Sequence, residues 1–414
     1  ILGELCYGDN QNHVRIVNSI VSRDNDNFDD DHYVEDFIKE KVVVKDGRIS
    51  VSMPWILPFE IDSNLNIVEK RLLKNIQRLK NINKFNDYQD IIKEYESLDI
   101  ISRTDITTDS SHYLNHHGVI REDKLTTKLR IVFDASCPDK NGISLNHCLY
   151  KGQTSWDLIR TFVQFRLKKY AIIADITRAF LMIELDENDR NYFKFLWIDS
   201  DDKMIAYRFN RVPFGTTSSP FLLFSALTKA FQTHHLTSKD HQNYLSYFYV
   251  DDMLVSGDTI DQVENISRTC AEVLDSFSFT LTKFVNNFKP TCSITSVLGL
   301  WWHVIDDMIS VKTIDSSEFH TPRQLTSLIA RHYDVFGIIS PFISEYRRIL
   351  SSVWTKTTHW DDKIPIEFIP KIEHVIKSFS QIMPIPRCVS FTSNSSLVLY
   401  TDATVNCIGC VFYL

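Results

Sequence analysis

The stretch Tyr247-Phe-Tyr-Val-Asp-Asp-Met-Leu-Val-Ser256 sets two adjacent carboxylates inside a run of aromatic and aliphatic residues. Strand-forming residues on both sides of Asp251 and Asp252 are typical of a tight hairpin with the acids at its turn. A second apolar run, residues 170–174, also ends on a carboxylate, Asp175. A single acidic hairpin turn can be an ordinary exposed turn without a functional role. Three acids in matching contexts instead predict two neighbouring strands that bring the carboxylates together.

Three neighbouring carboxylates suit metal-assisted phosphoryl transfer. Two Mg²⁺ ions held about 3.5–4 Å apart can clamp the attacking and the leaving oxygen of such a reaction. Mg²⁺ usually takes one or two carboxylates together with substrate phosphates. We therefore expect Asp175, Asp251 and Asp252 to be the catalytic residues and to bind two Mg²⁺ ions, for which Mn²⁺ can substitute.

Several stretches, in order along the chain, resemble reverse transcriptases, and those of BEL/Pao-type LTR retrotransposons in particular. The resemblance runs from about residue 49 to the C-terminus and implies RNA-directed DNA polymerase activity. It also implies an α+β fold shaped as a right hand, with fingers, a palm built on an antiparallel sheet, and a helical thumb or connection. The stretches are residues 113–136, 174–180, 248–252 and 321–331.

The resemblance also implies which residues surround the incoming nucleotide. Arg130 matches the position whose guanidinium grips the triphosphate, and a planar fork suits phosphate oxygens. Either Lys124 or Lys128 would be its companion. Phe180 lies where this class places a bulky ring beneath the sugar, which would clash with a ribose 2′-OH and so favour deoxynucleotides. Lys283 matches a lysine near the nucleotide, although an exposed strand lysine is equally plausible there.

Two further segments resemble parts of the polymerase that hold nucleic acid. The loop of residues 212–215 resembles the one that holds the templating base pair, which adds Phe214 and Gly215 to the nucleotide-binding residues. Glycine at 215 would let the backbone approach a nucleotide closely. Residues 296–302 resemble the hairpin that grips the primer end, although its two tryptophans can equally be core residues. The primer-grip residues would be Gly299, Trp301 and Trp302.

The length of 414 residues is too great for one ordinary core, so several subdomains are expected. The spacing of Leu72, Leu73, Ile76 and Leu79 predicts an amphipathic helix.

The end of the chain resembles the start of an RNase H-like α/β domain, and Asp402 would be its first carboxylate. The later acids of such a domain are absent, so we expect no RNase H activity from this chain. The expected segments are an acidic linker or polyprotein segment (1–48), a strand followed by amphipathic helices (49–110), fingers and palm (111–290), a primer-grip hairpin with a helical thumb or connection (291–390), and a truncated RNase H-like start (391–414).

The implied partners are those of a retroelement polymerase: an RNA template, a DNA or tRNA primer, dNTPs, and the rest of a Pol polyprotein with its protease, RNase H and integrase. The absence of a starting Met is typical of a piece cut from such a polyprotein. The net charge of −8 requires that any nucleic-acid binding rest on a local basic surface. The sequence contains no run of 18 apolar residues, so it predicts no membrane-spanning helix. Eight scattered cysteines favour a reducing compartment, so we expect a cytoplasmic protein in retrotransposon particles.

Two other functions remain open. One is a catalytically inactive polymerase-fold scaffold, from a decayed retroelement, that only binds nucleic acid. Three intact acids disfavour it, because a scaffold has no electrostatic reason to keep clustered carboxylates. The other is an RNA-directed RNA polymerase, which shares the palm and the acids but is disfavoured by the bulky Phe180. Incorporation of ribonucleotides would distinguish an RNA-directed RNA polymerase from a reverse transcriptase.

Overall fold

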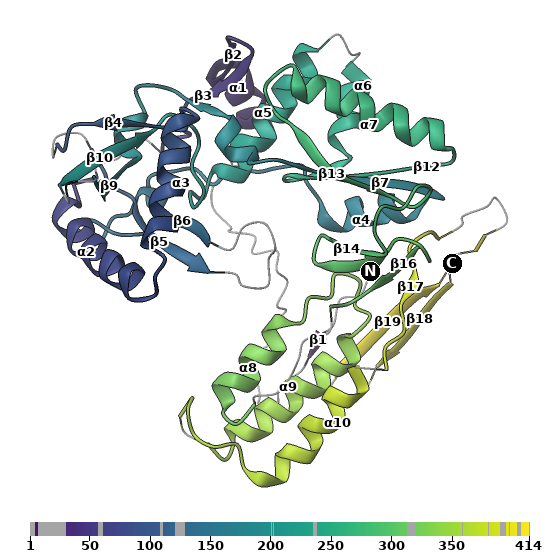
Figure 1. Ribbon diagram of the computed structural model, residues 1–414. Helices are drawn as coiled ribbons and strands as arrows, with labels where there is room; N and C mark the ends of the chain where they lie inside the picture. Colours follow the sequence, from purple (N-terminus) through teal and green to yellow (C-terminus); the bar gives the residue numbers. More distant parts are fainter. Residues whose placement is uncertain are drawn as a thin grey trace.

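The computed structural model has a mixed helix-and-sheet architecture in which a central antiparallel sheet connects two outer parts (Figure 1). One outer part, here called the fingers lobe, comprises residues 61–134 and 194–210. The other, here called the helical unit, comprises the helices of residues 319–379. The structure describes residues 5–6, 30–56, 61–107, 111–120, 129–199, 201, 203–234, 238–312, 319–357, 359–379, 381–389, 395–396, 398–403 and 407–413.

The segment before residue 49 contains a folded helix, which corrects the expectation of a linker over residues 1–48. Helix α1 (Asp30–Lys41) buries Phe37, whose ring centroid lies 4.9 Å from that of Phe221. Glu35, Asp36 and Glu40 of this helix are exposed, so an acidic composition hid an apolar face. The residues before Asp30, apart from 5–6, lie outside the described part of the chain. Strand β2 (Val42–Lys45) pairs with β3 (Arg48–Val51), which also pairs with β8 (Glu184–Leu185), so no domain boundary falls at residue 48.

The fingers lobe packs two helices against small antiparallel sheets. Helix α2 buries one hydrophobic stripe, as the spacing predicts. Leu73, which we expected on the same face, is 54% exposed, because consecutive helical residues point about 100° apart. The buried stripe consists of Val68, Leu72, Ile76 and Leu79. The elements of the lobe are α2 (Leu65–Asn81), α3 (Phe85–Ser97), β4 (Ile101–Thr104), β5 (Asn115–Ile120), β6 (Leu129–Asp134), β9 (Lys194–Ile198) and β10 (Met204–Phe209).

The central sheet has the strand order β11-β12-β7-β13, with every neighbouring pair antiparallel. Strand β7 is buried on both faces because helices cover both sides. Ile172 and Ala174 belong to the large core that includes residues of α5 and α7, whereas Ala171 and Ile173 pack with residues of α4. The bounds are β7 (Tyr170–Ile176), β11 (Phe248–Tyr249), β12 (Asp252–Gly257), β13 (Leu281–Asn286), α4 (Leu158–Arg166), α5 (Ser219–Thr233), α6 (Ser238–Leu245) and α7 (Ile260–Asp275).

A second small sheet carries the helical unit. Its strand order is β14-β15-β16-β17, and the helical unit lies in sequence between β16 and β17. The helices pack around a core of their own. The bounds are β14 (Ile294–Val297), β15 (Leu300–His303), β16 (Met308–Ser310), β17 (Ile385–Pro386), α8 (Pro322–Arg331), α9 (Ser340–Trp354) and α10 (Ile369–Phe379). A third sheet joins β18 (Val398–Ala403), β19 (Cys407–Tyr413) and β1 (Leu5–Cys6).

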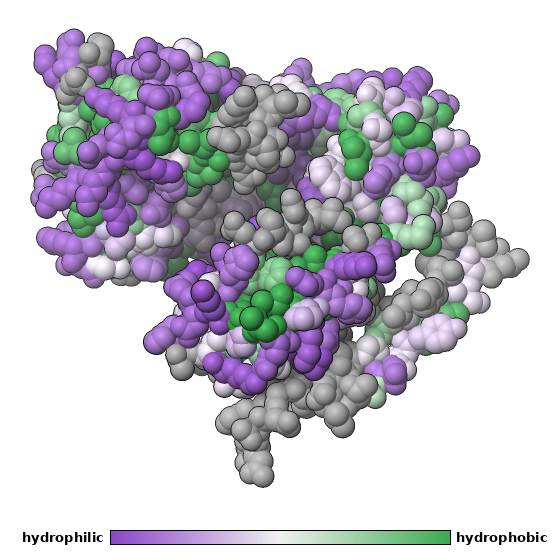
Figure 2. Space-filling model, turned by 60° about the horizontal axis from the view of Figure 1, so that its bottom comes forward, coloured by the Kyte–Doolittle hydropathy of each residue, from purple (hydrophilic) through white to green (hydrophobic). Residues whose placement is uncertain are grey.

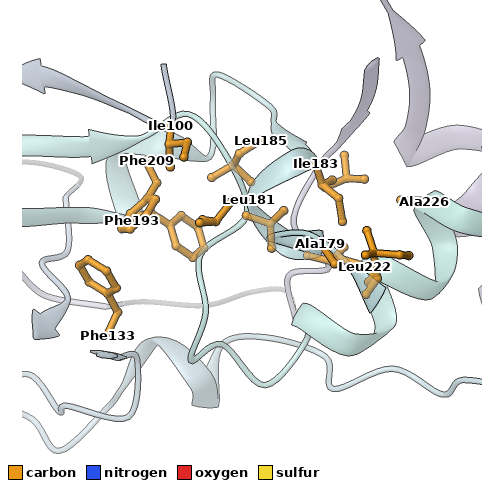
Figure 3. Packing of buried hydrophobic residues seen from close by; sticks show 14 of the residues in the cluster. Ile100, Phe133, Ala179, Leu181, Ile183, Leu185, Phe193, Phe209, Leu222 and Ala226 are labelled. Carbon is orange, nitrogen blue, oxygen red and sulfur yellow. The ribbon is translucent and has the colours of Figure 1, made fainter. Parts of the chain in front are cut away.

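The largest hydrophobic core runs without interruption from the central sheet into the fingers lobe. Leu181, in the short helix η2 (Ala179–Met182), lies between Phe193 and Phe209 on one side and Leu222 of α5 on the other (Figure 3). Close packing of this kind fixes the lobe relative to the sheet. The outer surface is different in character, since hydrophilic side chains cover most of the face in Figure 2, with smaller hydrophobic areas between them. Among the described residues no helix is long and apolar enough to cross a membrane.

Candidate active site

Two of the three predicted carboxylates lie directly opposite each other on neighbouring strands. Asp252 is the first residue of β12, and its partner across the antiparallel ladder is Asp175 of β7. Asp251 precedes it in the two-residue turn that connects β11 to β12, and its carbonyl accepts a hydrogen bond of 2.8 Å from the amide of Ile176. Val250, the other turn residue, has a φ of +57°, an unfavourable region for a β-branched side chain. The turn therefore holds Asp251 in place at some conformational cost.

The carboxylates share a partly buried, negatively charged position. Burial and then the charges of Asp251 and Asp175 together raise the pKa of Asp252 to about 7, against the opposing effect of Lys283. Burial and the charge of Asp175 also raise the pKa of Asp251, while Lys283 and Arg130 act in the opposite direction. Like charges held together in this way favour binding of a cation.

Lys283 is the cation that the protein itself places at this cluster. Its Nζ donates a hydrogen bond to Oδ2 of Asp175. It lies on β13, where the register with β7 shifts between Thr282 and Val285, and its own φ is +55°. This irregularity in the strand carries Lys283 to the carboxylates, where the family resemblance implied a lysine near the nucleotide.

The donor set fits a hard divalent cation in part. Carboxylate oxygens are the ligands that Mg²⁺ prefers, and it commonly takes one or two of them together with phosphate oxygens. The opposed pair Asp175 and Asp252 meets that requirement. In the part of the chain that the structure describes, no group of three or more His, Cys, Asp or Glu residues forms a metal-binding cluster. The expected cage of three carboxylates is thus reduced in this structure to an opposed pair with Asp251 in the adjoining turn.

Arg130 reaches toward this cluster from the fingers lobe. It is an exposed residue of β6, in the hairpin that β6 forms with β5. Its positive charge opposes the rise in the pKa of Asp251, so the guanidinium lies close enough to act on the turn between β11 and β12. Lys124 and Lys128, the two candidate companions, lie outside the described residues.

Phe180 and Phe214 form an aromatic pair beside the carboxylates. Their ring centroids are 5.2 Å apart and the ring planes meet at 83°, an edge-to-face arrangement. Phe180 lies in η2, four residues beyond the end of β7, and is partly buried, while Phe214 is 39% exposed. The two rings support each other, and Phe214 presents an open face to solvent.

Gly215 has a structural reason for being glycine that differs from the one the sequence suggested. Its φ is +98°, and a Cβ atom added here would lie 2.0 Å from the carbonyl oxygen of Phe133. The close approach at this position is therefore to β6 of the fingers lobe. The loop after β10 and the fingers hairpin are in direct backbone contact.

Asn146 organises this contact and was not identified as a functional residue from the sequence. Its Nδ2 donates to Oγ of Ser136 at 2.9 Å and to the carbonyl of Gly215 at 3.3 Å. Its Oδ1 accepts from the amide of Thr217 at 2.8 Å. Only the fold shows that this side chain ties the end of the fingers hairpin to the loop, because its partners Gly215 and Thr217 are distant in the sequence.

The predicted primer-grip residues lie at the β14–β15 hairpin and have different surroundings. Trp302 is fully buried, and its Nε1 donates to Asp307 at 2.9 Å, as expected for a core residue. Trp301 is partly exposed, with Nζ of Lys312 4.7 Å from its ring centroid. Gly299 has a φ of +90°, and a Cβ there would lie 2.6 Å from the ring of Tyr333. Only Trp301 offers a partly open ring surface.

Asp402 is separate from these groups. It is exposed on β18, opposite Gly409 of β19, in the sheet at the C-terminal end of the chain (Figure 1). Its carboxylate accepts a hydrogen bond of 2.8 Å from the amide of Ala403. The expected lack of RNase H activity stays a prediction.

Comparison with known families decides what the carboxylate cluster belongs to. Residues 124–284, which contain all three acids, match the family described as reverse transcriptase (RNA-dependent DNA polymerase). This segment resembles a reverse transcriptase domain. Residues 321–414 match the family described as Pao retrotransposon-like RNaseH-like domain. The resemblance to a Pao-type retrotransposon reverse transcriptase is therefore confirmed. The second match begins at residue 321, so it includes the helical unit as well as the strands that we expected to start an RNase H-like domain.

Solved structures of reverse transcriptases have the same fold. The foamy viral protease-reverse transcriptase in complex with an RNA/DNA hybrid has a TM-score of 0.53 and 14% sequence identity, over 88% of this chain and 45% of that one. The foamy viral protease-reverse transcriptase dRH in complex with ds DNA has a TM-score of 0.56 and 14% identity, over 87% of this chain and 67% of that one. The chain thus spans about half and two thirds of the two proteins' lengths. The expected mixed fold of a polymerase hand is confirmed.

Proposed function

We propose that this reverse transcriptase domain is an active RNA-directed DNA polymerase. In the proposed reaction the 3′-oxygen of a primer forms a bond to the α-phosphorus of a deoxynucleotide, the bond to the β-phosphate breaks, and pyrophosphate leaves. The observation that carries the proposal is the register of the central sheet, which sets Asp252 directly opposite Asp175 within the segment that matches reverse transcriptases.

Asp175 and Asp252 would hold the divalent cations of this reaction, with Asp251 beside them in the turn. When bound, such ions neutralise phosphate charge and polarise the reacting oxygens. The protein prepares the position by burying the acids and crowding their charges, which is reflected in the raised pKa values of Asp251 and Asp252. A bound divalent cation would lower both pKa values again, because it favours the ionised carboxylates.

Two cationic side chains would deal with the charge of the nucleotide. Arg130 approaches from the fingers hairpin, and its guanidinium can grip phosphate oxygens with two parallel hydrogen bonds. Lys283 neutralises Asp175 in the absence of other ligands. Its side chain is 74% exposed, so it can turn toward a triphosphate while the carboxylate takes a cation.

Phe180 would select the sugar. Its ring is held by the edge-to-face contact with Phe214, so it cannot easily move aside for a ribose 2′-OH. The nucleic-acid partners proposed are an RNA template and a DNA or tRNA primer. Support comes from the two related structures, which were solved with an RNA/DNA hybrid and with ds DNA.

The test is extension of a DNA primer on an RNA template with Mg²⁺, run with dNTPs and separately with rNTPs. We compare the wild type with Asp252→Asn and with the matched control Asp258→Asn, whose carboxylate pairs with Lys168 at 2.7 Å and is 65% exposed. Asp252→Asn is expected to lower extension at least about a thousandfold, the scale of losing charge stabilisation at a reacting centre. Asp258→Asn should keep most of the activity.

Each outcome bears on one function. Extension with dNTPs only, lost in Asp252→Asn, supports the reverse transcriptase. Extension with rNTPs at a comparable rate would indicate an RNA-directed RNA polymerase. Salt-sensitive binding of primer–template without any extension would indicate a catalytically inactive scaffold and would overturn the proposal.

A further inference from the structure

A cavity of about 330 Å³ lies behind the catalytic end of β7 and is lined by an unusual number of cations. Its lining residues come from β3, η2 and β13 and from the segments just before β4, just after β7 and just after β10. Hydrophobic side chains form part of its wall, among them Ile100 and Leu181, which also belong to the packed core seen in Figure 3. Its polar lining consists of Arg48, Arg178, Arg211, Thr177, Thr280 and Thr282. No carboxylate among the described residues lines the cavity.

Arg211 is the lining residue whose hydrogen bonds are incomplete. Its side chain is only 8% exposed, and its Nη1 is buried without a hydrogen-bond partner among the residues that the structure describes. Two carboxylates approach it at longer distances, Asp99 at 3.5 Å and Glu184 at 3.9 Å. A buried guanidinium is stabilised by well-formed hydrogen bonds to anions, and a charge that lacks them costs free energy. Arg211 thus lines the cavity with a guanidinium whose hydrogen-bonding capacity is not filled among the described residues.

The carboxylates near Arg211 are not enough to balance the local charge. Glu184 also pairs with Arg190, at 3.2 Å, and Asp99 is 74% exposed, so solvent weakens its effect. Arg48 brings a further positive charge, because burial and then the guanidinium of Arg48 lower the pKa of Arg211. Two guanidiniums that repel each other across a cavity make it favourable for an anion to enter.

Arg178 and the threonines complete a site with donors on several sides. Arg178 pairs with Glu94 at 2.5 Å and remains 38% exposed, so its other donors can turn toward the cavity. The hydroxyl groups of Thr177 and Thr282 form a hydrogen bond of 2.8 Å with each other, and that of Thr282 also lies 3.4 Å from the carbonyl oxygen of Asp175. One hydroxyl of this pair at a time can donate to a ligand. Hydroxyls beside guanidiniums are suitable donors for the several acceptor oxygens of a phosphate group.

We propose that this cavity is a binding site for a phosphate-type oxyanion. Arg48 and Arg211 would be its principal ligands, with the hydroxyls of Thr177 and Thr282 as further donors. The ligand is either a free phosphate or pyrophosphate ion, or the phosphate group of a mononucleotide whose remaining part contacts the hydrophobic wall. The site goes beyond the proposed polymerase reaction, because none of these residues belongs to the carboxylate cluster or to the aromatic pair.

The position of the site connects it with the active site without making it part of that site. Thr177 follows Asp175 by two residues, and Thr282 is the residue opposite Asp175 on β13. An anion held here would lie beside the strand that carries the first catalytic carboxylate. The alternative is that Arg211 only links Asp99 of the fingers lobe to Glu184 of β8, in which case no small anion should bind.

The test is isothermal titration calorimetry with inorganic phosphate, pyrophosphate and a nucleoside 5′-monophosphate in turn. The buffer contains EDTA, so that metal-dependent nucleotide binding at the carboxylates does not contribute, and chloride keeps the ionic strength constant. The variants are Arg48→Gln, at the partly buried rim, and Arg211→Lys. The control is Arg268→Gln, which removes the same charge from exposed α7, where Arg268 approaches Glu272 only at 4.0 Å.

We expect saturable binding to one site in the wild type and in Arg268→Gln, and affinity at least about tenfold lower in Arg48→Gln, equal to about 1.4 kcal/mol. Comparable binding of inorganic phosphate assigns the site to a free ion, and binding of the monophosphate alone assigns it to a phosphate ester. Arg211→Lys can fail to fold, so Arg48→Gln decides. The absence of saturable binding by all three ligands, or equal affinity in wild type and Arg48→Gln, would overturn the proposal. Neither result depends on polymerase activity.

Discussion

Arg387, which is fully buried, and Asp307 form a two-bonded ion pair that joins the segment after β17 to the turn between β15 and β16. Nε and Nη2 of Arg387 donate to the two carboxylate oxygens at 2.6 and 2.8 Å. The same guanidinium donates to the carbonyls of Phe165, Lys168 and Lys169 at and beyond the end of α4, at 2.5 to 3.0 Å. The last carbonyls of a helix lack partners within it, so Arg387 supplies what α4 needs. Through these carbonyls Arg387 connects the segment that matches the Pao family to the segment that matches reverse transcriptases.

We expect Arg387→Gln to destabilise the protein by about 3–5 kcal/mol, because it removes the charge that pairs with partly buried Asp307 and leaves several carbonyls short of a donor. The midpoint of urea unfolding would measure the loss. A matched control is Arg323→Gln, which breaks an equally well-formed pair with Asp361, at 2.8 and 3.0 Å, on an exposed surface. That change should leave the midpoint nearly unchanged. Equal shifts for the two variants would contradict the role of burial.

Gly215→Ala should be far more damaging than Gly142→Ala. Both glycines have positive φ, +98° and +84°, so both substitutions meet backbone strain. At Gly215 the new Cβ would also lie 2.0 Å from the carbonyl oxygen of Phe133, whereas at Gly142 nothing lies within 4 Å. We expect about 1 kcal/mol for Gly142→Ala and at least about 2 kcal/mol more for Gly215→Ala, from overpacking against the backbone.

Thermal unfolding of the two glycine variants measures this difference, and primer extension tests its consequence. If contact between the loop and β6 positions Phe214, Gly215→Ala lowers extension more than its loss of stability explains at the assay temperature. Similar unfolding temperatures for the two variants would show that the loop and the fingers hairpin separate easily.

The sequence alone was sufficient to predict an element where its local residue pattern reflects its burial in the fold. The apolar runs before Asp175 and around Asp251 predicted adjacent strands, because strand residues buried on both faces must be apolar. It was insufficient at α1, where exposed acids outnumber the few side chains, such as Phe37, that contact α5. Pairwise registers, such as Asp252 opposite Asp175, and cavities, such as the one lined by Arg211, depend on strands distant in the chain. No local pattern specifies them.

His116 makes the stability of the fingers lobe depend on pH. Its Nε2 donates to the carbonyl of Leu196 at 2.8 Å, while Nδ1 accepts from the hydroxyl of Tyr88, an arrangement that requires a neutral ring. Burial lowers its pKa from 6.5 to about 4. The unfolded chain therefore binds the proton more readily than the folded one. The stability from this group is complete above about pH 6.5 and is lost as pH falls toward 4.

We expect the free energy of unfolding to fall between pH 6.5 and 4 by up to about 1.4 kcal/mol per pH unit for each such histidine. His112 adds to the effect, because burial lowers its pKa to about 4 as well. The measurement is the urea midpoint at half-unit steps from pH 7.5 to 4.5. His116→Asn should lower stability at pH 7 and also flatten the slope. A variant that is less stable at every pH with the wild-type slope would show that His116 is not the titrating group.

Phe180→Ala should relax the choice of sugar. The wild-type ring contacts Phe214 edge-to-face at 83°, which holds it in place, so a ribose 2′-OH would clash with it. Removing the ring opens space for the hydroxyl while leaving Asp175, Asp251 and Asp252 in place. We expect the ratio of kcat/KM for an rNTP to that for the matching dNTP to rise at least about tenfold, equal to 1.4 kcal/mol of transition-state free energy.

The control for sugar selection is Phe284→Ala, which removes an equal ring that is 42% exposed on β13, next to Lys283. This change can alter extension as a whole, but it should affect both nucleotides alike and leave their ratio unchanged. Phe214→Ala should raise the ratio by less than Phe180→Ala, since the ring of Phe180 remains but loses its support. An unchanged ratio in Phe180→Ala would mean that this ring serves packing alone, and that the preference for deoxynucleotides, where present, comes from another contact with the sugar.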